Sequence, residues 1–184
     1  MLTVVRTALL AGLLLLPLGH HAEATQARRD TSALQFFGFR AGARLDELNQ
    51  RLRQDGAQPL RCRRSKIDGR VLECRGMLQR SDADPRVEVW VSAIDSLAGI
   101  MTLSGTVNPD QLDYWRLTLQ EEYGRVGTRV QGSQSMLQWV RRGRMIRLTW
   151  RREGRDKVAS VSLVDGHVLD GWGRARSGST RGRS

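Results

Sequence analysis

The stretch from Ser135 to Leu169 constrains the fold more than any other part of this 184-residue chain. It contains three runs in which apolar and polar residues alternate, the pattern of strands with one buried and one solvated face. Short polar segments, each with a glycine that can adopt a positive φ, separate the runs. Connections this short cannot make parallel crossovers, so the stretch predicts a three-stranded antiparallel meander. The predicted inward-facing residues are Leu137, Trp139, Ile146, Leu148, Trp150, Ala159, Val161 and Leu163.

An amphipathic helix directly upstream is the expected cover for this meander. Asn108 can cap it, Pro109 suits its first position, and Gln111 lies where a capping-box side chain reaches back. Gly124 stands where the helix should end. A single apolar stripe along the helix is formed by Leu112, Trp115, Leu119 and Tyr123.

The first half of the chain follows a similar plan. Leucines at helical spacing over 45–52, with acids early, arginines late and Gly56 afterwards, predict a helix of about three turns. An Asp-Gly hairpin turn at 68–69, a strand over 87–91 and another over 98–103 follow. We therefore expect an α+β fold of two helix-plus-antiparallel-meander units, with the helices packed on one face of the sheet. An ancient duplication or a shared β composition would both explain the similarity.

Composition divides the chain into five segments. Residues 1–24 have a basic start, a short apolar run and an Ala-Glu-Ala end, which is typical of a secretory signal peptide. The run is too short to span a bilayer, and no cysteine follows it that could carry a lipid. The remaining segments are a mobile lead (25–35), the first unit (36–106), the second unit (107–172) and a disordered basic tail (173–184).

Export determines how the two cysteines are interpreted. In an oxidising compartment Cys62 and Cys74 are expected to form a disulfide. The turn between them can set them on opposite strands. Because their spacing is not Cys-x-x-Cys, a structural role is favoured over redox catalysis.

The net charge of +11 favours acidic partners, because a field of that size attracts lipid headgroups, anionic polysaccharide or nucleic acid. Almost all of the basic residues are arginine, with only Lys66 and Lys157 as lysines. The codon bias of a GC-rich genome would also produce this composition. Both explanations remain open.

Two family resemblances rest on this pattern. The motif Gly-x₂-Leu-x₂-Leu-x₃-Leu-x₃-Gly over 42–56, placed before a hairpin, resembles the helical start of small outer-membrane-assembly lipoproteins of the SmpA/OmlA type. The doubled helix-plus-meander plan is similar to the tandem architecture of β-lactamase-inhibitor proteins. By element order the resemblance covers roughly residues 37–169. It implies an envelope protein that binds other proteins, although the lipoproteins' acylated cysteine is missing and no inhibitory residue carries over by position.

Few residues suggest catalysis. His167 is the only histidine after the signal segment, and with Asp165 and Asp170 it offers either an acid/base pair or a turn with an exposed histidine. With the cysteines paired, a metal site lacks ligands, and no phosphate-binding glycine loop is present. We expect no metal site, no cofactor and no enzymatic activity.

The candidate binding surface centres on Trp90, which alternates with the valines of its strand and so faces away from them. Arg75 and Arg86 should lie near it if the strands pair, and Trp172 is a second exposed candidate. We expect a periplasmic or secreted, noncatalytic binding or assembly module of the bacterial cell envelope, contacting an envelope protein or an anionic polymer. No specific nucleic acid and no transmembrane span after signal cleavage are expected. The alternatives are a protein inhibitor of a secreted enzyme and a cell-wall hydrolase.

Overall fold

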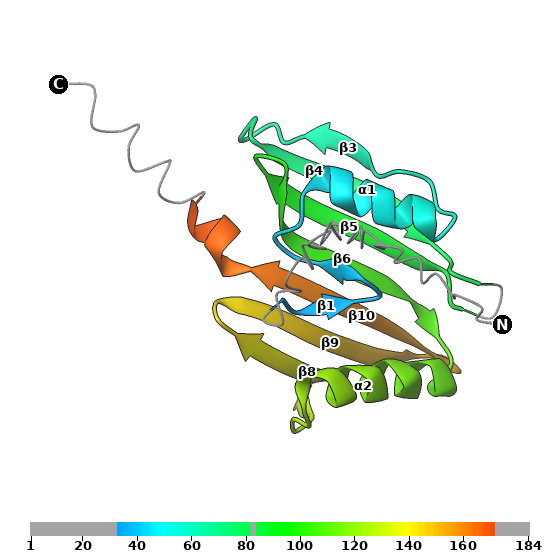
Figure 1. Ribbon diagram of the computed structural model, residues 1–184. Coiled ribbons are helices and arrows are strands. Elements are labelled where there is room, and N and C mark those ends of the chain that lie inside the picture. Colours follow the sequence, from blue (N-terminus) through cyan, green and yellow to red (C-terminus); the bar gives the residue numbers. More distant parts are fainter. Residues whose placement is uncertain (1–32, 82–83, 172–184) are drawn as a thin grey trace, which may run out of the picture.

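The structure is a computed structural model that describes residues 33–81 and 84–171 (Figure 1). An eight-stranded antiparallel sheet has the strand order β3-β4-β5-β6-β10-β9-β8-β7, and β1 and β2 form a separate hairpin. The strands are β1 (Gln35–Phe36), β2 (Phe39–Arg40), β3 (Arg61–Arg64), β4 (Val71–Leu78), β5 (Val87–Ile94), β6 (Leu97–Val107), β7 (Arg129–Gln131), β8 (Gln134–Arg141), β9 (Arg144–Glu153) and β10 (Asp156–Asp165). The helices are α1 (Leu45–Gln54), α2 (Pro109–Tyr123) and a short helix over residues 166–171.

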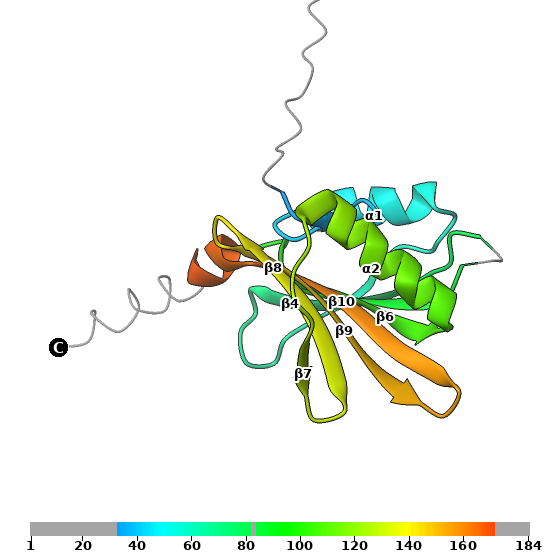
Figure 2. The same cartoon turned by 90° about the horizontal axis from the view of Figure 1, so that it is seen from below.

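The two halves of the sheet have the same element order. α1 precedes β3 to β6, and α2 precedes β7 to β10. In each half the first strand lies at an edge and the last lies at the centre, where β6 and β10 pair antiparallel. Both α1 and α2 lie on one side of the sheet (Figure 2). The α+β class and the placement of the two helices on one face are therefore confirmed.

One hydrophobic core lies between the sheet and the helices. Alternation along each strand supplies it, so that Val89 and Val91 of β5 are buried while Trp90 between them faces away. Trp150 differs from the other inward-facing residues because it is only partly buried, with the Arg116 guanidinium 5.5 Å from its ring centre. The other seven predicted inward-facing residues are buried: Leu137, Trp139, Ile146, Leu148, Ala159, Val161 and Leu163.

Helix α2 forms as its local signals predict. The Asn108 side chain accepts a hydrogen bond from the Gln111 N–H at 2.8 Å, and the Gln111 side chain accepts one from the Asn108 N–H at 3.0 Å. This capping box satisfies two donors that the first turn of a helix leaves unpaired. The helix ends at Gly124, whose φ of 90° favours glycine. The predicted stripe of Leu112, Trp115, Leu119 and Tyr123 is buried.

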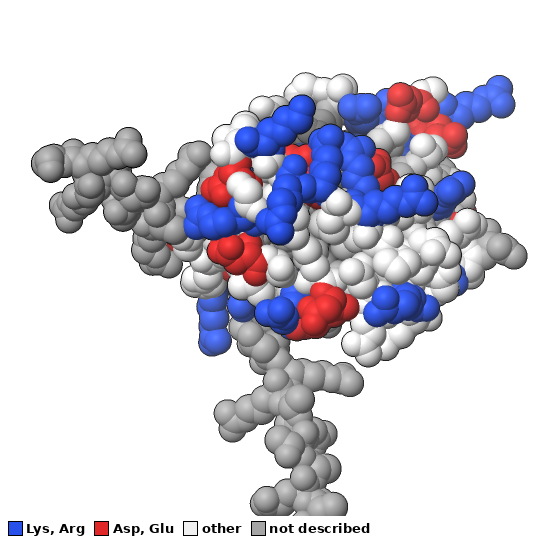
Figure 3. Space-filling view, turned by 90° about the horizontal axis from the view of Figure 1, so that it is seen from above, with Lys and Arg blue, Asp and Glu red and all other residues white. Residues whose placement is uncertain are grey.

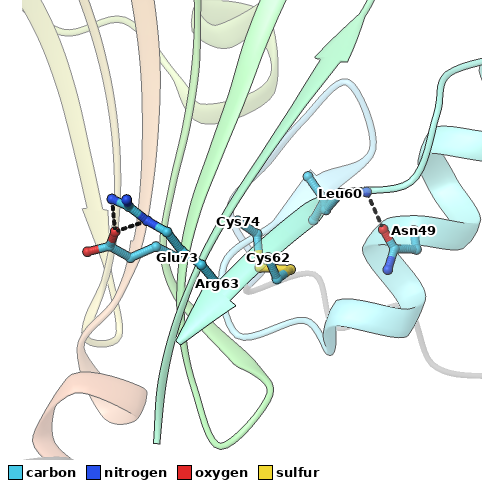
Figure 4. Close-up of a disulfide and its surroundings, with 6 residues drawn as sticks. All are labelled: Asn49, Leu60, Cys62, Arg63, Glu73 and Cys74. Carbon is cyan, nitrogen blue, oxygen red and sulfur yellow. Dashed lines mark hydrogen bonds and ion pairs between the residues drawn. A yellow bond between two sulfur atoms is a disulfide. The ribbon is translucent and has the colours of Figure 1, made fainter. Parts of the chain in front are cut away.

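Helix α1 has weaker end signals. Its N-cap residue, Arg44, makes no side-chain capping hydrogen bond. The carboxylates of Asp46 and Glu47 in the first turn stabilise the helix instead, because they lie near the positive end of its dipole. The three leucines at 45, 48 and 52 are buried, as their spacing predicts. Asn49 fixes the chain after the helix, because its side-chain oxygen accepts a 2.8 Å hydrogen bond from the Leu60 N–H (Figure 4).

The aromatic segment at 36–39 forms the hairpin of β1 and β2, which lies between the helices (Figure 1). Phe36 is 2% exposed, and its ring centre lies 5.3 Å from that of Trp115. The Tyr123 hydroxyl donates to the Gln35 carbonyl at 2.7 Å, and burial raises the pKa of this hydroxyl above its ordinary value. The predicted lead over 25–35 is too long at its end, because Leu34 is already buried.

The predicted disulfide is confirmed. Cys62 of β3 and Cys74 of β4 are direct cross-strand partners, and a disulfide joins them (Figure 4). Cys74 is fully buried and Cys62 is exposed, so the bond ties the outermost strand to the core. No free cysteine is present among the residues that the structure describes.

Several predicted segments lie outside the described residues: the signal segment 1–24, most of the lead, Trp172 and the tail 173–184. Strand β7 was not expected, because three exposed residues give no periodic signal. Within residues 33–81 and 84–171, no helix has the length and apolar character needed to cross a membrane.

Candidate binding surface

The sheet face opposite α1 and α2, here called the outer face, carries no layer of helices within the described residues (Figure 2). Its central strands present several short hydroxyl side chains, together with apolar residues such as Ile100 of β6. Two pairs contact across strands: Thr102 and Ser162 oxygens lie 3.1 Å apart, and those of Thr149 and Ser160 lie 2.7 Å apart. These hydroxyl groups can be hydrated, so this part of the face is compatible with contact to water.

Trp90 is the large aromatic residue of this face. It lies on β5 directly between Arg75 of β4 and Thr102 of β6, and it is partly exposed. Arg75 forms an ion pair with Glu88 at 3.2 Å, which holds the guanidinium beside β5. The structure thus brings Trp90 and Arg75 together, as the strand pairing predicts.

Arg75 and Arg86 lie at one corner of the outer face. Together they line a hollow of ≈ 550 Å³ beside β3, here called the basic hollow. Sequence reasoning missed Arg61, which also lines it. The predicted disulfide could have revealed it. If Cys62 and Cys74 are opposite each other on antiparallel strands, their neighbours Arg61 and Arg75 must also be opposite each other. The residues of the basic hollow are Gln58, Pro59, Arg61, Arg75, Gly76, Met77, Arg86 and Glu88.

A second hollow of ≈ 220 Å³ lies on the outer face between the β3–β4 turn and the short helix 166–171. Its apolar lining includes Val71, Ile100 and Leu169, and Ile67 at its rim is 86% exposed. Leu169 packs so closely on β6 that a Cβ at Gly99 would lie 2.9 Å from its side chain. The turn and the short helix therefore frame one end of the outer face.

Asp165 starts the short helix and is the one buried charged residue of the described chain. It accepts a 2.8 Å hydrogen bond from Arg144 and a 2.9 Å bond from the His167 N–H. Burial alone would raise the pKa of Asp165, but Arg144 and the N–H groups of Val168 and His167 outweigh it and hold the pKa below its ordinary value. The His167 ring instead lies 2.9 Å from the Arg142 carbonyl oxygen. The predicted turn is therefore wrong: Asp165 ends β10 and its side chain accepts hydrogen bonds from the first N–H groups of the short helix. His167 is exposed, as expected, and Asp165 contacts its backbone N–H rather than its ring.

This environment predicts a specific pH dependence. Because the pKa of folded Asp165 is depressed, its stabilising effect is present above the unfolded pKa and is lost as the pH falls through the folded pKa. We expect Asp165→Asn to lower the free energy of unfolding at pH 7 by roughly 2 kcal/mol, the value of a hydrogen bond to a charged group. Below the folded pKa the difference should shrink. Urea unfolding from pH 7 to pH 2 measures this, with the exposed Asp170→Asn as control. A constant difference at all pH values would contradict the assignment.

The carboxylates of the outer face are engaged by arginine. Glu73 accepts two hydrogen bonds from Arg63, at 2.8 Å and 3.1 Å, and Glu88 pairs with Arg75. Glu73 stands opposite Ser92, four residues from Glu88 along β5, which corresponds to roughly 13 Å. The described residues contain no group of three or more His, Cys, Asp or Glu that could hold a metal ion.

Comparisons with known proteins give no further guide to this surface: no family model, no curated protein and no solved structure significantly matches the chain.

Proposed function

We propose that this protein is an exported, noncatalytic binding or assembly module of the bacterial cell envelope, and that its outer face contacts a partner protein. The observation that carries this proposal is Trp90 on a broad sheet face that α1 and α2 leave uncovered and that the short helix 166–171 frames at one end only. Tryptophan and arginine are common anchors of protein interfaces, and Arg75 adjoins Trp90 here. The disulfide fits an oxidising compartment.

The size of the outer face supports a protein partner. Eight strands about 4.8 Å apart span roughly 34 Å, and six residues of a strand run about 20 Å. The product is roughly 700 Å², close to the ≈ 800 Å² that each side contributes to a standard protein interface.

The carboxylates of the face give less support to the hydrolase alternative. The backbone positions of Glu73 and Glu88 are roughly 13 Å apart along the strands, whereas the acid and base of an inverting glycosidase hold their carboxyl groups within about 9.5 Å of each other. Each of these carboxylates also pairs with an arginine. An inhibitor of a secreted enzyme would use the same outer face, so the identity of the partner separates that alternative from an assembly role.

We expect Trp90→Ala to weaken binding of the partner by about 2 kcal/mol, or about 30-fold, because a buried aromatic anchor is lost. Wild type and variant, each from Thr25 onward, are used for capture from envelope extract at low and high salt, followed by affinity measurement on the captured protein. Tyr114→Ala is the matched control, because Tyr114 is an exposed aromatic residue on α2.

The proposal fails if Trp90→Ala and Tyr114→Ala bind equally well. It also fails if only polyanions are captured and salt removes them equally from all versions, since exposed charges are screened by salt. If the captured partner is an enzyme, its activity with and without this protein distinguishes an inhibitor from an assembly module.

A further inference from the structure

The basic hollow has an excess of positive charge. Three arginines, Arg61, Arg75 and Arg86, line it with one carboxylate, Glu88, so its formal charge is 3 − 1 = +2. It lies beside β3, an edge strand of the sheet. Figure 3 shows the molecule from the side of β3, where blue Lys and Arg side chains gather with red Asp and Glu side chains among them.

The arrangement of these arginines leaves positive charge without an equal number of carboxylate partners among the described residues. Arg61 and Arg75 are direct cross-strand partners, and like charges directly opposite each other destabilise a sheet. Only Arg75 has a carboxylate partner, Glu88. Neither the Arg61 nor the Arg86 guanidinium makes a hydrogen bond or ion pair within the part of the chain that the structure describes.

The three arginines of the basic hollow are not explained by a need to prevent the edge strand from pairing with another chain. Arginines on an edge strand discourage pairing with another chain, which is sufficient reason for Arg63 and Arg64 on β3. Those two have internal partners, Glu73 and the Gly69 carbonyl. Arg86, however, lies before β5 and not on the edge, yet it lines the same hollow as Arg61. Residues from three separate segments converge there.

The chemistry of the hollow matches one kind of anion. Guanidinium groups bind phosphate oxygens through paired N–H donors. A phosphate monoester carries about −1.5 to −2 charges at pH 7, which balances the formal +2, whereas a carboxylate or a phosphodiester carries only one charge. The Gln58 amide adds a donor, and Pro59 and Met77 offer apolar surface for the group that bears the phosphate.

We propose that the basic hollow binds a phosphate monoester, with Arg61, Arg75 and Arg86 holding its oxygens. The site adjoins the outer face through Arg75, but it does not depend on the protein partner proposed above. Anion binding is measurable with the protein alone, so this proposal and the proposed function succeed or fail separately.

Titration calorimetry at fixed ionic strength tests the site, with glucose 1-phosphate as the probe and acetate as the singly charged comparison. We expect saturable binding of glucose 1-phosphate and much weaker binding of acetate. Arg61→Gln and Arg86→Gln should each weaken binding by roughly tenfold, the loss of one charge-assisted contact. Glu88→Gln should strengthen it by removing the competing carboxylate. Binding should also weaken from pH 7.5 to pH 5, because the second pKa of a phosphate monoester is about 6.

The matched control is Arg155→Gln, another exposed arginine, in the turn between β9 and β10. It removes the same charge from a different part of the protein and should leave binding unchanged. If it weakens binding as much as Arg61→Gln does, only the net charge matters and the proposal is overturned. Absence of glucose 1-phosphate binding overturns it as well. Equal urea midpoints for all variants show that folding is intact.

Vesicles identify the source of the phosphate. Phosphatidylcholine vesicles with and without phosphatidic acid present the same monoester on a lipid. Sedimentation with phosphatidic acid that is lost in Arg61→Gln and Arg86→Gln, but kept in Arg155→Gln, supports a lipid headgroup. Binding of glucose 1-phosphate without vesicle binding supports a soluble or polymer-borne phosphosugar at the same site.

Discussion

Replacing Trp115 by alanine is expected to lower the free energy of unfolding by about 4 kcal/mol, within the range for large aromatic residues in a core. Trp115 is 1% exposed, and its ring meets the rings of Phe36 and Phe37, with centres 5.3 Å and 5.8 Å away. It therefore joins α2 to the β1–β2 hairpin. Removing the indole leaves a cavity between elements that pack on the sheet and cannot collapse independently.

Urea unfolding followed by circular dichroism measures this loss. Tyr114→Ala is the control, because Tyr114 precedes Trp115 on the same helix but is 53% exposed, and it should change stability by less than about 0.5 kcal/mol. The two variants change helix propensity similarly. If both lower stability by the same amount, the effect comes from the helix itself and not from packing of the indole against the hairpin.

Local sequence signals predicted most of the elements. The Asn108-Pro109 start, the capping-box Gln111 and the stripe ending before Gly124 define α2 without any tertiary information, and the structure confirms each of them. Alternation likewise predicted the inward faces of β8, β9 and β10. These features depend on residues two to four positions apart, so a single chain is enough to find them.

Long-range pairing was harder to predict. Nothing in the sequence indicates that β6 and β10 are neighbours, yet this pairing joins the two units into one sheet. The burial of Asp165 was also missed, because its partner Arg144 is 21 residues away and lies on the adjacent strand β9. Trp90 could be assigned to the outer face from alternation alone, whereas the basic hollow required the register of three separate segments.

The central pairing also explains why one side of the sheet lacks a helical layer. Each unit has its helix before its edge strand, and the two units meet through their last strands. Both helices thereby pack on the same side (Figure 2). Serine and threonine on the opposite side can be hydrated, so this side is stable in water while remaining accessible to a partner.

Loss of the disulfide is expected to lower the free energy of unfolding by about 3 kcal/mol, the chain-entropy value for a loop of this length. The cysteines are 12 positions apart, and β3 pairs with β4 alone. All four β3 residues are exposed, so burial contributes little to holding this strand in place. The covalent bond therefore adds to the β3–β4 ladder and the Arg63–Glu73 ion pair in keeping β3 against the sheet.

The test compares wild type, oxidised and reduced, with the double variant Cys62→Ala and Cys74→Ala. Reduction should lower the stability of the wild type and leave the variant unchanged, and hydrogen exchange should become faster in β3 before it does so in β5. If exchange instead became faster by the same factor in β3 and β5, the disulfide would stabilise the whole sheet and not β3 in particular. Since Arg61 stands beside Cys62 and lines the basic hollow, release of β3 should also weaken anion binding there. The disulfide would then stabilise the fold and the position of Arg61 together.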